Sequence, residues 1–123
     1  MKIGEAIKII DDLRPNQYTD DDKVRWLSVL DGKTHIEVIK THEGGENVVW
    51  EAYTPADMDA ELIIPAPYDY EVYINWLMAQ IDMANAEVGK YNQSITLYNT
   101  AFMQWQQYYN RTHMPLGLPR FRW

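Results

Sequence analysis

The sequence has no cysteine and only two phenylalanines among its 123 residues. Without cysteine the chain can form no disulfide and no thiolate metal site, and it has no cysteine nucleophile. No stretch approaches the roughly 18 uninterrupted apolar residues of a transmembrane helix, so we expect none. Glu5 and Lys8 interrupt the apolar residues near the start, so we expect no secretory signal. These absences predict a protein that stays inside the cell, or one that belongs to a particle assembled there.

Tyrosine and tryptophan take the place of phenylalanine, because the chain contains nine Tyr and five Trp. Their rings have an apolar body and a polar group, which suits surfaces that are buried at one end and wet at the other. Aromatic residues are also enriched at protein–protein interfaces. A chain of this length forms one domain. The composition predicts that this domain completes its core with a partner.

Charge is distributed unevenly along the chain, whose formal net charge is -7. Residues 41–89 contain ten acids and no base, whereas residues 90–123 contain four bases and no acid. The acidic balance argues against a module that reads DNA sequence. A solvated acidic face with a basic tail would account for this pattern. Head-to-tail association would account for it as well, because the basic end of one subunit could meet the acidic middle of the next and close a ring.

Apolar residues recur at helical spacing in the first third of the chain and predict helices at about 2–13 and 20–42. Pro15 ends the first helix, because proline disfavours helical backbone at the residue before it. Thr19 is a favourable N-cap for the second, and three aspartates follow it where the helix dipole favours negative charge. The core candidates of the second helix are Val24, Leu27, Leu30, Ile36 and Ile39.

The sequence of residues 43–66 predicts an irregular segment with little β-structure. We expect short extended runs at 48–50 and 62–64, and about one helical turn starting at Thr54-Pro55. A loop of this length within a small domain is usually functional or forms an arm.

The clearest pattern lies in residues 68–112, where apolar and aromatic residues repeat at alternating spacings of four and three over five heptads. Such a repeat predicts sustained helix–helix packing. Because the repeat is unbroken, it favours one long or gently kinked helix, whereas a break at 89–92 would give a helix pair. The repeating residues are Leu77, Ile81, Ala84, Val88, Tyr91, Ile95, Tyr98, Phe102, Trp105 and Tyr109.

The predicted fold is therefore mainly α: a small helical bundle with a long C-terminal helix or helix pair. Residues 1–113 form the single helical domain of this prediction, and residues 114–123 form an extended C-terminal arm. Two prolines and a glycine exclude a helix in the arm, which ends Arg-Phe-Arg-Trp. Because disordered tails are usually poor in aromatics, we interpret it as a docking arm, with a frayed terminus as the alternative.

The sequence contains no arrangement typical of catalysis. The histidines lack metal-site spacing, the serines lack a glycine elbow, and no glycine-rich phosphate loop is present. The three aspartates after Thr19 are explained as a helix start. We therefore predict a non-enzyme with no catalytic, cofactor-binding or metal-binding residues and no cofactor. The histidines are His35, His42 and His113, and the serines are Ser28 and Ser94.

Several short motifs spread over the whole chain resemble small proteins encoded in the structural module of tailed-phage and prophage genomes. They are Leu-Arg-Pro-Asn at 13–16, Lys-Val-Arg-Trp-Leu at 23–27, Pro-Tyr-Asp at 67–69 and Tyr-Asn-Arg-Thr-His-Met-Pro at 109–115. The chain is similar to head-tail connector (head completion, adaptor) proteins, which are mostly helical and form rings below the portal. The motifs are structural, so the resemblance assigns no catalytic residue.

The resemblance implies a virion component, present in the host cytoplasm during assembly, that partners itself, the portal and neighbouring connector or tail proteins. It implies neither sequence-specific nucleic-acid binding nor a membrane partner. The alternative is a soluble helical interaction or regulatory module that binds another helix through the heptad residues. The predicted partner interface is Trp105, Tyr109, Arg111, Arg120, Phe121, Arg122 and Trp123. The predicted acidic face toward the DNA channel is Glu43, Glu46, Glu51, Asp57, Asp59 and Glu61.

Overall fold

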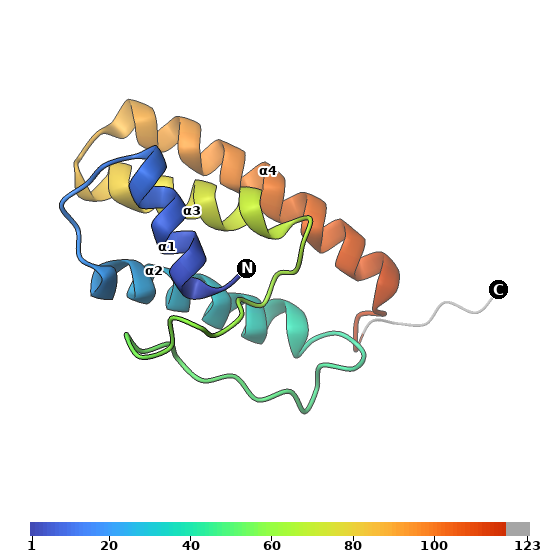
Figure 1. Ribbon diagram of the computed structural model, residues 1–123. Helices are drawn as coiled ribbons and strands as arrows, with labels where there is room; N and C mark the ends of the chain where they lie inside the picture. The colour runs from blue at the N-terminus through green and yellow to red at the C-terminus, as the bar shows by residue number, and fades with distance from the viewer. Residues whose placement is uncertain (118–123) are drawn as a thin grey trace.

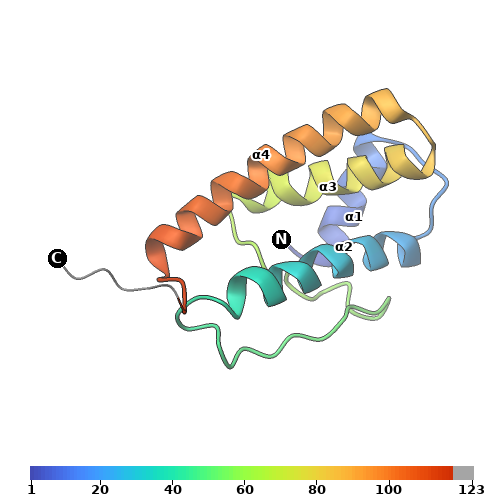
Figure 2. The ribbon, with the colours of Figure 1, turned by 180° about the vertical axis from the view of Figure 1, so that it is seen from behind.

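The computed structural model describes residues 1–117 and shows a bundle of helices in that part of the chain (Figure 1). Helices α3 and α4 form an antiparallel hairpin, and α1 lies across α2 and α3 (Figures 1 and 2). β-Structure within residues 1–117 is limited to two isolated bridges. The prediction of a mainly helical bundle is confirmed. The elements are α1 (Ile3–Leu13), α2 (Asp20–Thr34), the π-helical turn η1 (His35–Ile39), α3 (Asp69–Ala84) and α4 (Val88–Thr112).

The helix ends follow from the local sequence. The Thr19 hydroxyl accepts a hydrogen bond from the Asp22 N–H at 3.2 Å, and the Asp22 carboxylate accepts one from the Thr19 N–H at 3.3 Å. This reciprocal pair is a capping box, and it begins α2 where the sequence predicts. Helix α1 ends at Leu13, two residues before Pro15.

The predicted helix at 20–42 is shorter than expected, because α2 continues only through η1 to Ile39. One core prediction within it is wrong, since the Ile36 side chain is 65% exposed. The buried face follows Leu27, Thr34 and Val38, and Ile36 lies about half a turn away from it.

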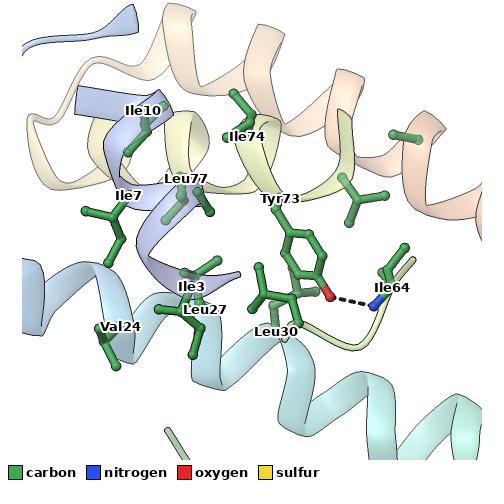
Figure 3. Close-up of a cluster of buried hydrophobic side chains, with 14 of the residues drawn as sticks. Ile3, Ile7, Ile10, Val24, Leu27, Leu30, Ile64, Tyr73, Ile74 and Leu77 are labelled. Atoms are coloured by element: carbon green, nitrogen blue, oxygen red, sulfur yellow. Dashed lines mark hydrogen bonds between the residues drawn. The ribbon is translucent and has the colours of Figure 1, made fainter. Parts of the chain in front are cut away.

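The core lies where α1, α2 and α3 meet (Figure 3). Isoleucines at positions 3, 7 and 10 form one buried stripe of α1, the spacing of an amphipathic helix. Full burial of such a side chain contributes about 1.5–3 kcal/mol. The other residues labelled in the close-up come from α2, α3 and the segment before α3: Val24, Leu27, Leu30, Ile64, Tyr73, Ile74 and Leu77.

Residues 68–112 form a helix pair and not one long helix, so the favoured prediction from the heptads is wrong. The chain turns at 85–87, and the proposed break point at 89–92 lies inside α4. At the turn the heptad residue Val88 is 68% exposed. Away from the turn the repeat packs α3 on α4. Tyr98 of the repeat, for example, contacts the Trp76 ring of α3, with 5.0 Å between the ring centroids. The same heptad pattern serves an antiparallel hairpin because each helix needs one apolar face.

Residues 41–68, named here the acidic segment, join η1 to α3 and run along α2 without forming a strand (Figures 1 and 2). The expected helical turn at 54–57 is a hydrogen-bonded turn, in which the Asp57 N–H donates to the Thr54 carbonyl at 2.9 Å. Leu62 and Ile64 are buried, so the end of the segment contributes to the core.

The turn between α3 and α4 predicts the effect of a substitution. Ala86 has a φ of 57°, a left-handed conformation that costs a non-glycine residue about 1–2 kcal/mol. Ala86→Gly should therefore raise the free energy of unfolding by about 1 kcal/mol, net of the entropy that glycine adds to the unfolded chain. Urea denaturation provides the measurement.

The matched control is Ala84→Gly, two residues earlier in the last turn of α3. Glycine there should lower the free energy of unfolding by up to about 1 kcal/mol, because it disfavours helix. If both substitutions lower the free energy of unfolding, the left-handed conformation of Ala86 does not destabilise the folded protein.

Candidate interaction surfaces

The acidic segment contains all six residues of the predicted channel face. Five are exposed and Asp57 is half-buried. Two have structural partners, since Asp57 accepts the Thr54 N–H at 2.7 Å and Glu61 pairs with the Met1 amino group at 3.1 Å. Three others are exposed and form no ion pair with any of residues 1–117. These three are Glu46, Glu51 and Asp59.

A buried carboxylate on α2, that of Asp31, fixes the position of the acidic segment. Asp31 has no exposed surface. Its Oδ2 accepts hydrogen bonds from the Tyr53 hydroxyl at 2.5 Å and from the Ile63 N–H at 3.1 Å, both in the segment. Its Oδ1 accepts one from the Tyr73 hydroxyl of α3 at 2.6 Å. We call these four residues the Asp31 cluster.

Tyr73 extends the cluster, because its hydroxyl also accepts the Ile64 N–H at 2.8 Å (Figure 3). Burial raises the pKa of Asp31 above its ordinary value, and the three donors act in the opposite direction. Burial and the nearby Asp31 charge raise the pKa of both Tyr53 and Tyr73, so the two phenols stay protonated and remain donors.

Gly32 provides a further attachment of the segment. A Cβ at this position would lie 3.1 Å from the Trp50 indole, so the glycine lets that ring lie close to α2. Trp50 also contacts the Tyr53 ring at 5.3 Å and the His35 ring at 6.2 Å between centroids. Glycine costs a helix about 1 kcal/mol relative to alanine, and here it makes room for an aromatic cluster.

The structure corrects part of the predicted partner interface. Trp105 is only 1% exposed and belongs to the core, with its ring 5.6 Å from Phe102 and 5.3 Å from Tyr109. This tryptophan is therefore buried within the chain and is not available to a partner. Tyr109 is half-buried and Arg111 is exposed. The remaining predicted residues, Arg120, Phe121, Arg122 and Trp123, lie outside the described residues.

The C-terminal arm begins against the end of the π-helical turn. The Glu43 N–H donates to the Met114 carbonyl at 2.9 Å, and the Leu116 N–H donates to the Thr41 carbonyl at 2.6 Å. His42 lies buried beneath this pairing. Its Nδ1 is 2.6 Å from the Val38 carbonyl and its Nε2 is 2.5 Å from Asn110 Oδ1, so the ring links η1 to α4.

A second buried carboxylate, Asp82 of α3, links three helices. It pairs with Arg14, which follows α1, and it accepts a hydrogen bond from the Ser94 hydroxyl of α4 at 2.8 Å. Ser94 thus has a structural partner.

Within residues 1–117 no three His, Asp or Glu side chains are grouped so that they could hold a metal ion. None of the helices in this part of the chain combines the length and apolar character needed to cross a bilayer.

Two grooves lie on opposite sides of the α3–α4 hairpin. The first, of about 340 Å³, is lined by Leu13, Tyr70, Ile74, Leu97 and Ala101 among others, with Glu71 at its wall. The second, of about 260 Å³, lies between α2 and the hairpin and includes Trp76, Tyr98 and Phe102. Helix α4 contributes residues about half a turn apart to the two grooves, which therefore face in opposite directions.

Comparisons of the chain with protein-family models, with curated protein sequences and with solved structures find no match.

Sequence reasoning missed Asp31, although a signal was present. Asp31 lies four residues after Leu27 and three before Thr34, so it falls on the buried face of α2. An acid at a core position must find hydrogen-bond donors. The spacing alone does not identify those donors.

The Asp31 cluster predicts a ranking of tyrosine substitutions. Tyr73→Phe removes one donor to a buried carboxylate and the acceptor of the Ile64 N–H, so it should lower the free energy of unfolding by about 3 kcal/mol. Tyr53→Phe removes one donor and should cost about 2 kcal/mol. The control is Tyr108→Phe on the exposed side of α4. This substitution should change the free energy of unfolding by less than about 0.5 kcal/mol. Urea denaturation measures all three, and equal losses would contradict the ranking.

The raised pKa of Asp31 predicts a pH dependence. An unfolded aspartate loses its proton near pH 4, whereas the folded protein keeps this proton to higher pH. The titration of Asp31 therefore lowers the free energy of unfolding as the pH rises from about 4 through the folded pKa. Above that pKa, Asp31 makes no further contribution to the pH dependence of the free energy of unfolding.

Asp31→Asn removes this titration. The free energy of unfolding of the variant minus that of the wild type should increase across that window and then level off. Urea titrations between pH 4 and 8 measure the difference. A difference that stays constant, or that decreases with pH, would show that the folded pKa is not raised.

Proposed function

We propose that the chain is a structural component of a tailed-phage particle, a head-tail connector or head completion protein that assembles as a ring at the portal vertex. The observation that carries the proposal is the acidic segment, which the Asp31 cluster fixes on the bundle with five of its six acidic residues exposed. The sequence motifs that resemble connector proteins support the same assignment.

An acidic surface suits a channel through which DNA leaves the head. Lys and Arg bind phosphates and release counterions, so a basic channel would retain DNA non-specifically. Carboxylates such as Glu46, Glu51 and Asp59 would repel the backbone and let it slide. The exposed Arg111 and the arginines of the arm supply the opposite charge for contact with a neighbouring subunit.

The buried polar groups support a structural role. Asp31, Asp82, Ser94 and His42 each hydrogen-bond to a second element of the bundle. Buried polar groups committed in this way specify how the elements fit together, as a subunit of a larger assembly requires.

The alternative is a soluble interaction module that binds another helix. Exposed apolar residues on α4, such as Leu97 and Met103, favour it. The two functions differ in their partner, since only a connector requires the portal.

Co-expression with the portal protein of the same genome tests the proposal. We expect a stable complex that carries a ring of this chain, visible by electron microscopy, and a larger mass by mass photometry than the portal alone. A chain that remains monomeric or dimeric at every concentration and does not copurify with the portal would favour the interaction module.

Neutralising the exposed acids tests the channel role. The variant Glu46→Gln, Glu51→Gln, Asp59→Asn should retain DNA on portal complexes at low salt, and the retention should disappear as salt increases. The control neutralises three exposed acids outside the segment: Asp12→Asn, Asp21→Asn and Glu37→Gln. Retention that is unchanged in the first variant, or equal in both, would exclude the segment from the channel.

A further inference from the structure

We infer that the groove between α3 and α4 receives the C-terminal arm of a neighbouring copy of the chain. This inference rests on the proposed association of copies and adds the surfaces that meet. The groove has a volume of about 340 Å³. Leu13, Tyr70 and Leu97 line it and are exposed, so an apolar surface is open to solvent here. A partner that covers it would gain from their burial.

The charge of the groove favours a basic occupant. Glu71 is exposed and is its one charged lining residue within the described part of the chain. The α3 residues that line the groove belong to the stretch 41–89, which contains no base. A guanidinium beside Glu71 would therefore meet no repulsion from that stretch, and arginine pairs well with a carboxylate.

The arm has the matching chemistry. Residues 118–123 lie outside the described residues, and the sequence there ends Arg120-Phe121-Arg122-Trp123. The segment thus offers two aromatic rings to an apolar groove and two guanidinium groups to the carboxylate at its wall. Trp and Arg are the residues most often found to dominate binding energy at interfaces.

The position of the arm favours an occupant from a neighbour. Residues 114–116 pair with residues 41–43 beside the end of η1, next to the C-terminal end of α4 (Figures 1 and 2). That attachment is on the side of α4 that also carries Tyr98 and Phe102, which face α2. The groove residues of α4 lie about half a turn away. The arm therefore starts on the far side of the hairpin from the groove of its own chain.

Such a contact joins two different surfaces of identical subunits. Contacts of this kind are heterologous, and they form a ring when the rotation between subunits closes. The groove and the arm would thus be the two halves of one repeated interface.

Binding of a fluorescent peptide of residues 114–123 to the full chain, followed by anisotropy at low protein concentration, tests the inference. Leu97→Ser should weaken binding about tenfold, since it removes one buried aliphatic side chain. The matched control is Met103→Ser, also on α4. The two side chains are 58% and 57% exposed, but Met103 does not line the groove. We expect less than a twofold change for it, and circular dichroism verifies that both variants fold.

A charge exchange gives a second measurement. Glu71→Arg should weaken binding of the wild-type peptide about fivefold. A peptide with Arg122→Glu should bind the wild-type chain weakly and regain affinity for the Glu71→Arg chain. Glu37→Arg, beside the opposite groove, should leave binding unchanged.

Equal weakening by Leu97→Ser and Met103→Ser, or no recovery in the charge exchange, would overturn the inference. Concentration-independent crosslinking between residues 71 and 122 would overturn it as well, because the arm would then occupy the groove of its own chain. If the chain copurifies with the portal but binds no peptide, the connector proposal stands and this inference is overturned. If the peptide binds as expected but no portal complex forms, the inference about the groove stands and the connector proposal is lost.

Discussion

The rest of the structure depends on the burial of one carboxylate. Asp31 has no contact with water, and an ion in that position needs donors to offset the loss of hydration. Two donors come from the acidic segment and one from α3, so the carboxylate is satisfied only when both are in place. The long segment therefore has one position on the bundle, although it forms no regular structure of its own.

The same principle operates at other junctions. Asp82 joins the end of α1 to α3 and α4, and the buried Lys23 ammonium donates to the Tyr18 carbonyl at 2.8 Å and pairs with Asp11 at 2.7 Å. Removing one partner of such a pair is costly, because it leaves a charge buried and unpaired. These polar junctions specify how the helices fit together. Aliphatic side chains fill most of the core between the helices, and Tyr73 and Trp105 complete it.

The sequence predicts the local features of the fold well. The N-cap at Thr19, the stripe of isoleucines in α1 and the irregular course of the acidic segment all depend on neighbouring residues. The choice between one helix and two at 68–112 does not, because both arrangements need the same heptads. The turn at 85–87 carries no local signal, since Ala86 adopts there a left-handed conformation that alanine disfavours. Trp105 shows a similar limit, since an aromatic residue enriched at interfaces serves a core equally well. The donors to Asp31 are 22, 32 and 42 residues distant in the chain, so only the fold reveals them.

The bridge between residues 41–43 and 114–116 has a mechanical consequence. The acidic segment and the arm leave the bundle from the same short pairing, held by two backbone hydrogen bonds and backed by His42. Tension applied to the arm would load those two bonds before it reached the helices. The helical body would then keep its shape under strain while the pairing gave way first. The pulling force needed to separate the arm is thus set by this bridge and not by the stability of the bundle.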